Sequence, residues 1–339
     1  MLKMDPNKKV KICSNNNISI TEVKAKLTFS DIIGSFKVRW GINRMNFKVN
    51  PGLYSLGKPD SNSPVMVTGN YKMSFDALRK ELTDINAYIL VLDTKGINVW
   101  CAASKGTFGT NELLNRIKKV NLSQVVTHKN LILPQLSATG ISAHEVLKKS
   151  GFKVVYGPVR AEDIPYFLNN EMQATAEMRR VRFNLVDRTV LTPVEIVGSL
   201  KISFIIFGIM FLLNLLTIGN FKSIDVIAYL GAILVGGVLV PMILPWIPGR
   251  AFSFKGWIIG LLWAISVIVF NKMTFNLSSV AYMLILPSVA SYYAMNFTGC
   301  STYTSLSGVI KEMKIAVPLI VTSIALGIII LLVSNFVSI

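Results

Sequence analysis

Cysteine, histidine and acidic residues are scarce in this chain. Its 339 residues include three Cys, two His and 18 Asp plus Glu, against 35 Lys plus Arg. Three cysteines cannot supply the four ligands of an iron–sulfur cluster. His128 and His144 lack the partners of a zinc site. The composition therefore argues against a chain that carries its own iron–sulfur cluster or depends on zinc.

Two further classes of ligand find little support. The segment Ser104-Lys105-Gly106-Thr107 has Lys before Gly and lacks the upstream glycine of a phosphate-binding loop, so we do not expect nucleotide binding. The net charge of +17 is spread along the chain and concentrates beside apolar segments. Anionic lipid attracts basic residues in that position. We therefore expect no nucleic-acid partner.

Long apolar runs with almost no charge occupy the second part of the chain. Residues 1–198 hold 28 Lys plus Arg and 16 Asp plus Glu, whereas the rest holds 7 and 2. Runs of about 20 apolar residues are long enough to cross a bilayer. Lys255 weakens the third run, so four spans are the alternative to five. The sequence predicts an all-α transmembrane domain, 193–339, with five spans at about 199–218, 226–247, 251–270, 277–297 and 315–336.

The second span contains Gly236-Gly237 followed by three prolines, the last at Pro248. Small residues let helices approach closely, and proline interrupts a helix. We therefore expect close packing in the middle of this span and a break or kink near its end.

The charges between the spans predict an orientation. Basic residues border the start of span one, the connection between spans two and three, and the approach to span five: Arg179, Arg180, Arg182, Arg188, Lys201, Arg250, Lys255, Lys311 and Lys314. The other two connections carry only Lys222 and Lys272. By the positive-inside rule we expect a multi-pass protein of the inner (cytoplasmic) membrane, with its N-terminal domain in the cytoplasm and its C-terminus outside. In that reducing compartment Cys13, Cys101 and Cys300 should be thiols.

The first part of the chain alternates helical and strand patterns. We expect helices at 74–82, from 99, at 111–120 and at 142–150, and strands at 87–93, 131–133 and 153–156. Such alternation favours a parallel, Rossmann-like α/β sheet within a cytoplasmic domain at 46–192. Ligands of such sheets bind beyond the carboxyl ends of the strands, where residues 94–105 fall. Residues 1–45 show no clear pattern and are taken as a basic, partly ordered extension.

Cys101 lies in the octet Asn98–Lys105, directly after the apolar run Ala87–Asp93 and a turn. Asn98 is suited to cap a short helix whose first turn contains Cys101. The free backbone N–H groups of that turn, and Lys105 four residues further on, favour a thiolate. A small thiol buried beside a strand is the alternative.

The segment around this cysteine, GINVWCAASKGTFGT, resembles the signature of the HgcA family, the membrane-bound corrinoid proteins of microbial mercury methylation. Ser104 stands where the family usually has Gly, and Ser137 stands where it more often has Gly. The resemblance extends in the same order over about residues 65–339, through VTGNYKMSFDALRKEL, LILPQLSATGISAHEV, GFKVVYGPVRAEDIP, DRTVLTPVE and NFTGCSTYTSLSGV.

This resemblance implies a cobalt corrinoid bound with its own nucleotide base displaced. It implies that Cys101 is the catalytic residue and the lower axial ligand of the metal. The implied cofactor-binding residues are Asn98, Val99, Trp100, Cys101, Ala102, Ala103, Ser104, Lys105, Gly106 and Thr107, with the turn Thr68, Gly69 and Asn70 at the periphery.

The same resemblance implies a methyltransferase that passes a methyl group to Hg(II). A thiolate is a soft, electron-donating ligand, which favours departure of methyl as a carbanion equivalent or a radical; the sequence leaves both open. Cobalt must be reduced between turnovers, so a reducing partner is needed. The implied partners are a ferredoxin-like protein with two [4Fe–4S] clusters, which also serves as a candidate Hg(II) donor, and a methyltetrahydrofolate-linked methyl donor in an anaerobe.

Two other functions stay open. One is a membrane-anchored corrinoid methyl carrier, related to the corrinoid iron–sulfur protein of the acetyl-CoA pathway, without activity on mercury. The other is a transporter, which is weaker because the spans show no internal repeat and carry charge only at their edges, at Asp225 and Glu312. The connection Asn296–Lys314 is long and rich in Ser, Thr and Gly, and we interpret it as a docking surface rather than a solvated linker.

Overall fold

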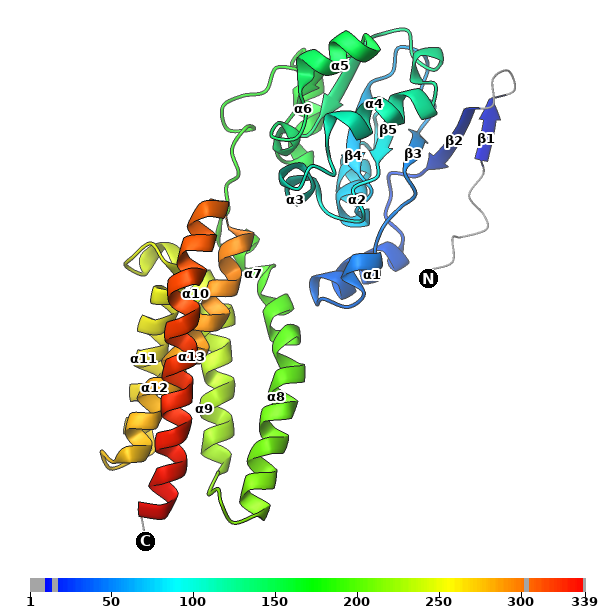
Figure 1. Cartoon of the computed structure of the whole chain (residues 1–339). Helices are drawn as coiled ribbons and strands as arrows, with labels where there is room; N and C mark the ends of the chain where they lie inside the picture. Colours follow the sequence, from blue (N-terminus) through cyan, green and yellow to red (C-terminus); the bar gives the residue numbers. More distant parts are fainter. Residues whose placement is uncertain (1–9, 14–17, 302–304, 338–339) are drawn as a thin grey trace. The chain divides into compact units, whose positions relative to one another are not determined.

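The computed structural model describes residues 10–13, 18–301 and 305–337 and separates into two compact units (Figure 1). The first, here called the α/β unit, holds the described residues up to Val181 except Arg39–Gly41. The second, the helical unit, begins at Arg182. The division lies a little before Pro193, where the charge composition of the sequence changes.

A seven-stranded mixed sheet forms the α/β unit. Its strands, in chain order, are β1 (Val10–Cys13), β2 (Ile18–Val23), β3 (Gly52–Leu56), β4 (Val65–Gly69), β5 (Ala87–Leu92), β6 (Asn130–Leu133) and β7 (Lys153–Tyr156). They are ordered β1-β2-β3-β5-β4-β6-β7 in the sheet. The helices of the unit are α1 (Phe29–Arg39), α2 (Lys72–Glu81), α3 (Val99–Ser104), α4 (Thr110–Lys119), α5 (Ala143–Ser150) and α6 (Ile164–Asn169).

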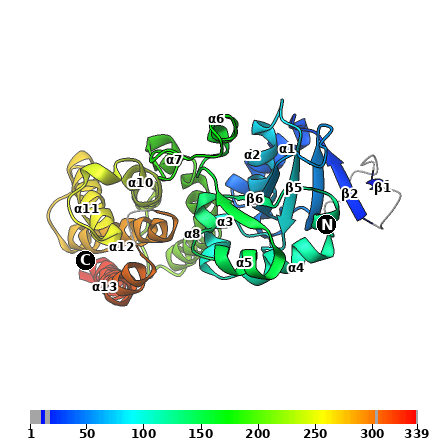
Figure 2. The same ribbon diagram turned by 90° about the horizontal axis from the view of Figure 1, so that it is seen from above.

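Helices cover both faces of this sheet (Figure 2). Alternate residues of each central strand point to opposite faces, as the pleat requires. Leu90 and Leu92 of β5 pack with α3, α4 and α5, whereas Ile89 and Val91 pack with α2 and α6. Both sets are buried. The central strands therefore read as continuous apolar runs because each face meets a layer of helices.

The predicted elements from residue 72 to 156 are present, with ends that differ by one or two residues. The prediction of a parallel sheet holds for β4, β5, β6 and β7. It is wrong for β3, which runs antiparallel to β5, and β1 is antiparallel to β2. The connection 57–64 from β3 to β4 contains no helix, and a parallel return needs a crossover of a dozen residues or more. The chain therefore reverses direction at that connection.

Residues 18–45, for which the sequence showed no pattern, form β2 and α1 and the short 3-10 helix η1 (Arg44–Asn46). The strand β2 pairs in parallel with β3, and α1 makes the crossover between them. Most apolar residues of α1 are exposed, so no stripe facing a core marked it in the sequence.

Ion pairs fix α1 to α2. The carboxylate of Asp31 accepts hydrogen bonds from Lys72 Nζ at 2.5 Å and from Arg79 Nη2 at 2.8 Å. Burial alone would raise the pKa of Asp31, but the hydrogen bonds from Lys72 and Thr28 and the charge of Lys72 outweigh it, and the pKa lies well below its ordinary value. A carboxylate whose pKa is lower in the folded than in the unfolded state stabilises the fold. Its contribution is complete at a pH above the unfolded-state pKa and is lost as the pH falls through the folded-state pKa.

We therefore expect α1 to loosen in acid. Amide hydrogen exchange across residues 29–39, corrected for the intrinsic effect of pH, should speed up as the pH falls below about 4, the ordinary pKa of Asp. In Asp31→Asn the corrected exchange should already be fast at neutral pH and should change little on acidification. Equal protection of α1 in both proteins over this range would show that the ion pairs do not hold it.

Within the described part of the helical unit, five helices are long and apolar enough to span a membrane, at Leu185–Leu215, Ser223–Met242, Phe252–Phe270, Leu277–Gly299 and Ser307–Ser334. The prediction of about five apolar helices is confirmed. The elements are α7 (Leu185–Thr189), α8 (Thr192–Leu215), α9 (Ser223–Leu234), α10 (Val240–Met242), α11 (Phe252–Phe270), α12 (Leu277–Asn296) and α13 (Leu306–Val337). The weak third run forms α11, where the buried Lys255 donates from Nζ to the carbonyl of Leu244 at 2.7 Å.

The second span is interrupted as its glycines and prolines predict. A π-helical turn, Val235–Leu239, follows α9, and after the short α10 the chain passes into a 3-10 turn at Leu244–Trp246. Gly236 packs against α12 so closely that a Cβ there would lie 2.2 Å from the carbonyl oxygen of Ala290. Close packing at the middle of this segment is therefore possible because residue 236 is a glycine, which has no side chain.

Gly236→Ala should destabilise the helical unit by about 1–3 kcal/mol, because the added methyl group forces the π-helical turn and α12 apart. Thermal unfolding in detergent measures this. Gly208→Ala on α8 is the matched control, since nothing lies within 4 Å of a Cβ at that position. Equal midpoints for the two variants would mean that the contact with Ala290 relaxes without cost.

The connection before the last span is shorter than expected. Helix α13 begins at Leu306, so residues 306–314, predicted as part of a loop, are helical. Glu312 accepts a hydrogen bond from the backbone N–H of Ser253 at 2.6 Å, at the start of α11. A helix that continues past the hydrocarbon can carry charged residues, which is why the apolar pattern alone placed its start too late. Residues 302–304 of the predicted docking segment lie outside the described residues.

Candidate functional site

The carboxyl ends of four parallel strands meet at one edge of the α/β unit. Strand β4 is central, with β5 on one side and β6 on the other. The connections that leave β4 and β5 therefore diverge here, and open α/β sheets bind ligands at such a switch point. The segments 70–71, 93–98, 134–142 and 157–158 follow these strand ends and form the edge.

Asn70 holds the turn that leads to Cys101. Its side-chain oxygen Oδ1 accepts hydrogen bonds from the backbone N–H groups of Thr94 at 3.1 Å and Gly96 at 2.9 Å, and lies 2.9 Å from the Thr94 hydroxyl. Lys95 and Gly96 both have positive φ, at 59° and 74°, a conformation of two-residue turns that favours glycine. Asn70 and Thr94 are almost completely buried. Asn70, the residue after β4, therefore fixes the backbone of the turn that leads into α3.

Gly69 permits this contact between neighbouring strand ends. A Cβ at this position would lie 2.8 Å from the Thr94 hydroxyl. Asn70 also donates from its amide nitrogen to Asp93 at 3.3 Å. The residues Thr68, Gly69 and Asn70, predicted as a periphery of the cofactor, thus lie beside the turn that precedes α3. The side chain of Thr68 is buried in the sheet, and that of Asn70 is occupied by the turn.

Cys101 lies in the first turn of α3. Asn98 caps this helix as predicted, since its side-chain oxygen accepts from the backbone N–H of Cys101 at 2.9 Å. The helix has only six residues, so its dipole is short. It ends at Ser104, and Gly106, the residue after the C-cap Lys105, has a φ of 76° that favours glycine.

One face of α3 points outward. Trp100 and Cys101 are half-buried and Ser104 and Lys105 are exposed, and their spacing of one, four and five residues places them together on the helix surface. Val99, Ala102 and Ala103 lie on the opposite face and are buried in the core shared with β4, β5 and β6. The alternative of a cysteine buried beside a strand does not hold, because Cys101 keeps access to the surface.

The predicted residues therefore divide into two groups. The side chains of Val99, Ala102 and Ala103 form the support of the site, together with Thr68 and Asn70. Those with access to the surface are Asn98, Trp100, Cys101, Ser104, Lys105 and Thr107, with Gly106 at the end of the helix. Ser104, one of the two residues that depart from the family pattern, donates a hydrogen bond from its hydroxyl to the carbonyl of Trp100 at 3.2 Å.

Two positions that the sequence reasoning missed hold α3 from the other side. A Cβ at Gly140 would lie 2.3 Å from the carbonyl oxygen of Phe108 and 3.1 Å from Ala103, so the connection after β6 touches the helix backbone. Phe108 is completely buried and joins the segment after α3 to the core. The Thr-Gly pair before the next helical pattern was the available signal for Gly140.

The edge also holds a fixed negative charge. Asp93, the first residue after β5, pairs with Lys95 Nζ at 3.1 Å. Burial would raise the pKa of this carboxyl, but hydrogen bonds from the backbone and side chain of Lys95 outweigh it, so the pKa is lowered. Asp93 therefore stays ionised at neutral pH and is unsuited to act as a general acid there.

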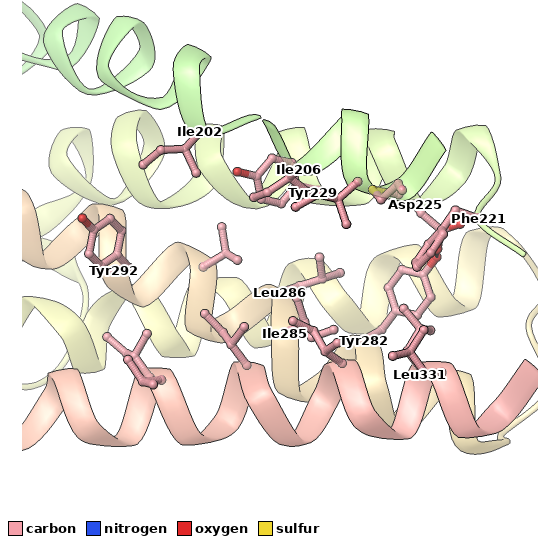
Figure 3. A pocket seen from close by; sticks show the side chains of 18 of the residues that line it. Ile202, Ile206, Phe221, Asp225, Tyr229, Tyr282, Ile285, Leu286, Tyr292 and Leu331 are labelled. Carbon is pink, nitrogen blue, oxygen red and sulfur yellow. Dashed lines mark hydrogen bonds between the residues drawn. The ribbon is translucent and has the colours of Figure 1, made fainter. Parts of the chain in front are cut away.

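The helical unit contains a separate cavity of about 520 Å³ (Figure 3). Its lining comes from α8, α9, α12 and α13 and is nearly all apolar, including Ile206, Ile285 and Leu286. Asp225 accepts a hydrogen bond from the Tyr282 hydroxyl at one end. Among the described residues no group of three or more His, Cys, Asp or Glu side chains is arranged to hold a metal ion. The thiol of the α/β unit therefore remains the stronger candidate for reactive chemistry.

Trp100 provides a test of how the outward face is used. If its ring forms a wall of the site, Trp100→Ala should lower the rate of methyl transfer several-fold. The free energy of unfolding should change little, because the side chain is half-buried. If the ring acts as core, stability and cofactor content should fall together. Thermal unfolding and the cofactor-to-protein ratio of one preparation separate the two.

Lys105→Ala should lower the rate of methyl transfer, the activity that the resemblance implies, through the loss of positive charge, with no effect on stability.

The fold and the position of the Cys101 thiol, on a helix that follows β5, define the class of protein: an open α/β ligand-binding unit with an accessible thiol. Comparison with known proteins indicates which members of this class are similar to the chain. The family model described as CO dehydrogenase/acetyl-CoA synthase delta subunit matches residues 37–168. This range contains β3 to β7 and α3, and none of the five apolar helices.

Curated relatives agree with that match. The acetyl-CoA decarbonylase/synthase complex subunit gamma of Methanopyrus kandleri is 32% identical over 126 residues, which are 37% of this chain and 27% of the relative. The corrinoid/iron-sulfur protein large subunit of Moorella thermoacetica is 30% identical over 122 residues, 35% of this chain and 27% of the relative. The chain thus spans about a quarter of the length of these relatives. The α/β unit is therefore similar to part of an acetyl-CoA decarbonylase/synthase subunit and to part of a corrinoid/iron-sulfur protein.

Proposed function

We propose that the α/β unit binds a cobalt corrinoid at the carboxyl edge of its sheet, with Cys101 as the lower axial ligand. The observation that carries this is the position of Cys101, half-buried on the outward face of α3 with its backbone N–H held by Asn98. A thiolate is a soft donor suited to such a metal. The similarity to part of a corrinoid/iron-sulfur protein supports the same class of cofactor.

The surroundings of the thiol fit a flat ligand. Trp100 contributes a large apolar surface next to Cys101, and Lys105 contributes a positive charge one helical turn away. Gly106, Thr107 and Ser104 complete the accessible part of the segment. No carboxylate belongs to this outward face, so a thiolate there has no negative neighbour on its own helix. Val99, Ala102 and Ala103 anchor the helix from below.

In this proposal the chain positions and tunes its cofactor, while the corrinoid supplies the carbon–cobalt chemistry. Asn98 and the turn fixed by Asn70 hold Cys101 in place. Lys105 favours the thiolate form. Gly140 and Gly69 have no side chains, which lets the connection after β6 approach α3 and lets Thr94 approach β4.

We propose that the protein is a methyltransferase with Hg(II) as the methyl acceptor. Support for this acceptor comes from the resemblance described above, which includes segments of the helical unit that the matched range 37–168 leaves out. A membrane-anchored methyl carrier of one-carbon metabolism is the second candidate, and the names of the curated relatives favour it. Both candidates need the same site.

The proposal includes external partners and a location. A ferredoxin-like protein with two [4Fe–4S] clusters would supply electrons and Hg(II), and a methyltetrahydrofolate-linked protein would supply the methyl group. The basic residues at one end of the spans support an α/β unit on the cytoplasmic side of the membrane.

Purified full-length chain loaded with methylated corrinoid tests the acceptor. Incubation with Hg(II) and a low-potential reductant should give methylmercury in proportion to the loaded corrinoid. Free corrinoid at the same concentration is the control for transfer without protein. Loaded chain that gives no more methylmercury than free corrinoid, but hands its methyl group to an acetyl-CoA-forming enzyme, would favour the carrier.

A further inference from the structure

We propose that the exposed apolar face of α1 and the turn after it, here called the α1 face, binds the surface of an anionic phospholipid bilayer. This inference concerns a segment outside the candidate site and stands whether or not the chain binds a corrinoid. The α1 face consists of Phe29, Ile32, Ile33, Phe36, Ile42 and Met45.

The side chains of this face are large, apolar and solvent-exposed. Phe29 is 77% exposed, Phe36 62% and Met45 65%. Phe29, Ile33 and Phe36 are four and three residues apart, which places them in one line along the helix. A contiguous exposed patch of this kind marks an interaction surface rather than ordinary scattered exposure.

The opposite side of α1 is fixed to the α/β unit. Asp31 pairs with Lys72 and Arg79 of α2, and Val38 is buried with Phe47 and Tyr71. Gly34 packs on the Phe47 ring so closely that a Cβ would lie 2.7 Å from it. Because these contacts hold one side, the helix cannot rotate its apolar line inward. The exposed face is therefore a property of the folded unit.

Basic residues border the α1 face. Lys37 and Lys48 are exposed and Arg44 is half-exposed. The one acidic residue of α1, Asp31, is on the packed side and is neutralised by two cations. An apolar helix face with Phe and Ile and a border of Lys and Arg has the chemistry of helices that lie in the interface of anionic membranes.

The same chain carries candidate membrane-spanning helices. In its described residues five helices are long and apolar enough to span a bilayer, and the first of them begins at Leu185, four residues after the α/β unit ends at Val181. Charge complementarity favours anionic lipid over a neutral apolar partner, since each basic residue near such a surface adds to binding. We therefore commit to a lipid surface rather than to a protein partner.

The α1 face also lies near the candidate site within the α/β unit. The carbonyl of Met45 approaches Gly96 so closely that a Cβ on Gly96 would lie 3.2 Å away. The backbone of Lys48 forms an isolated antiparallel β-bridge with Tyr71, two residues after β4. A unit held to the bilayer by this face would present the edge with Cys101 close to the lipid headgroups.

Photocrosslinking in the full chain tests the proposal. The residue p-benzoylphenylalanine replaces Phe36, and the protein is placed in vesicles of phosphatidylcholine with phosphatidylglycerol. Irradiation should link position 36 to phospholipid, detected by mass spectrometry of the α1 peptide. The matched control replaces Leu147 on α5, which is 50% exposed on the same unit and should give little lipid product.

Charge reversal provides the second arm. Lys37→Glu with Lys48→Glu should lower the lipid product at position 36 by about twofold or more in the anionic vesicles. Lys118→Glu with Lys119→Glu on α4 makes the same change of charge away from the face and should leave it unchanged. A product at position 36 with the chain's own helices, with a second copy or with another protein would overturn the proposal, and so would a lipid yield no higher than at position 147.

Discussion

Cys101→Ala is expected to abolish methyl transfer while leaving the fold intact. The side chain is half-buried on the outward face of α3, so removing its sulfur should cost less than about 1 kcal/mol of stability. Alanine is a good helix former at that position. If Cys101 is the lower axial ligand, the absorption spectrum of the bound corrinoid should change in the variant. The measurements are the visible spectrum, the methyl-transfer rate and the thermal midpoint of one preparation.

Ser104→Ala is the matched control for this change, because Ser104 lies on the same outward face and its hydroxyl is engaged with the Trp100 carbonyl. It should keep both the spectrum and most of the activity. Cys13→Ala and Cys300→Ala should also be close to silent; the side chains of these two residues lie outside the described part. An unchanged spectrum together with unchanged activity in Cys101→Ala would remove Cys101 from the site.

Asn70→Ala should have the largest effect on stability among single substitutions near the site. The change removes an acceptor for the N–H groups of Thr94 and Gly96, both of which are buried. Buried donors without an acceptor cost about 1–3 kcal/mol each. We expect a loss of about 2–4 kcal/mol from the α/β unit, with faster hydrogen exchange in residues 93–104 and weaker corrinoid binding.

Asn62→Ala serves as the comparison, because Asn62 is exposed and accepts from the Thr127 hydroxyl at 2.7 Å. Its effect on stability should stay within about 0.5 kcal/mol. Exchange in residues 93–104 that stays as slow in Asn70→Ala as in Asn62→Ala would contradict the role of Asn70 as the support of the turn. If Asn70→Ala lowers stability but binds as much corrinoid as the unchanged protein, Asn70 supports the fold and is not needed for the site.

The predicted elements from α2 to β7 were found in the structure, since each carries a complete local signal. The run 87–92 is apolar and rich in β-forming residues, and 111–120 has the helical spacing of Leu113 and Ile117. The strands β3 and β4 were not predicted. Both are five residues long and contain Gly, Ser or Thr, so their pattern is weak without the neighbours that bury them.

The site was predictable in part. The cap at Asn98 and the place of Cys101 in the first turn follow from local residue types, and both are present. The exposure of Cys101 was not predictable, because it depends on which side of α3 meets the sheet. The close contact of Gly140 with Phe108 and Ala103 joins residues more than 30 positions apart, and no local signal encodes such a contact.

The sequence by itself determined the division into an α/β part and an apolar helical part, the long apolar helices and the short helix that begins after Asn98. These depend on periodicity, charge and capping, which act over a few residues. Only the tertiary structure decided the mixed direction of the sheet, the exposed face of α1 and the fixing of the Thr94 turn by Asn70. Each of these depends on contacts between segments distant in the chain, such as Asp31 with Arg79 and Asn70 with Gly96, and the free energy of such contacts exists only once the fold brings them together.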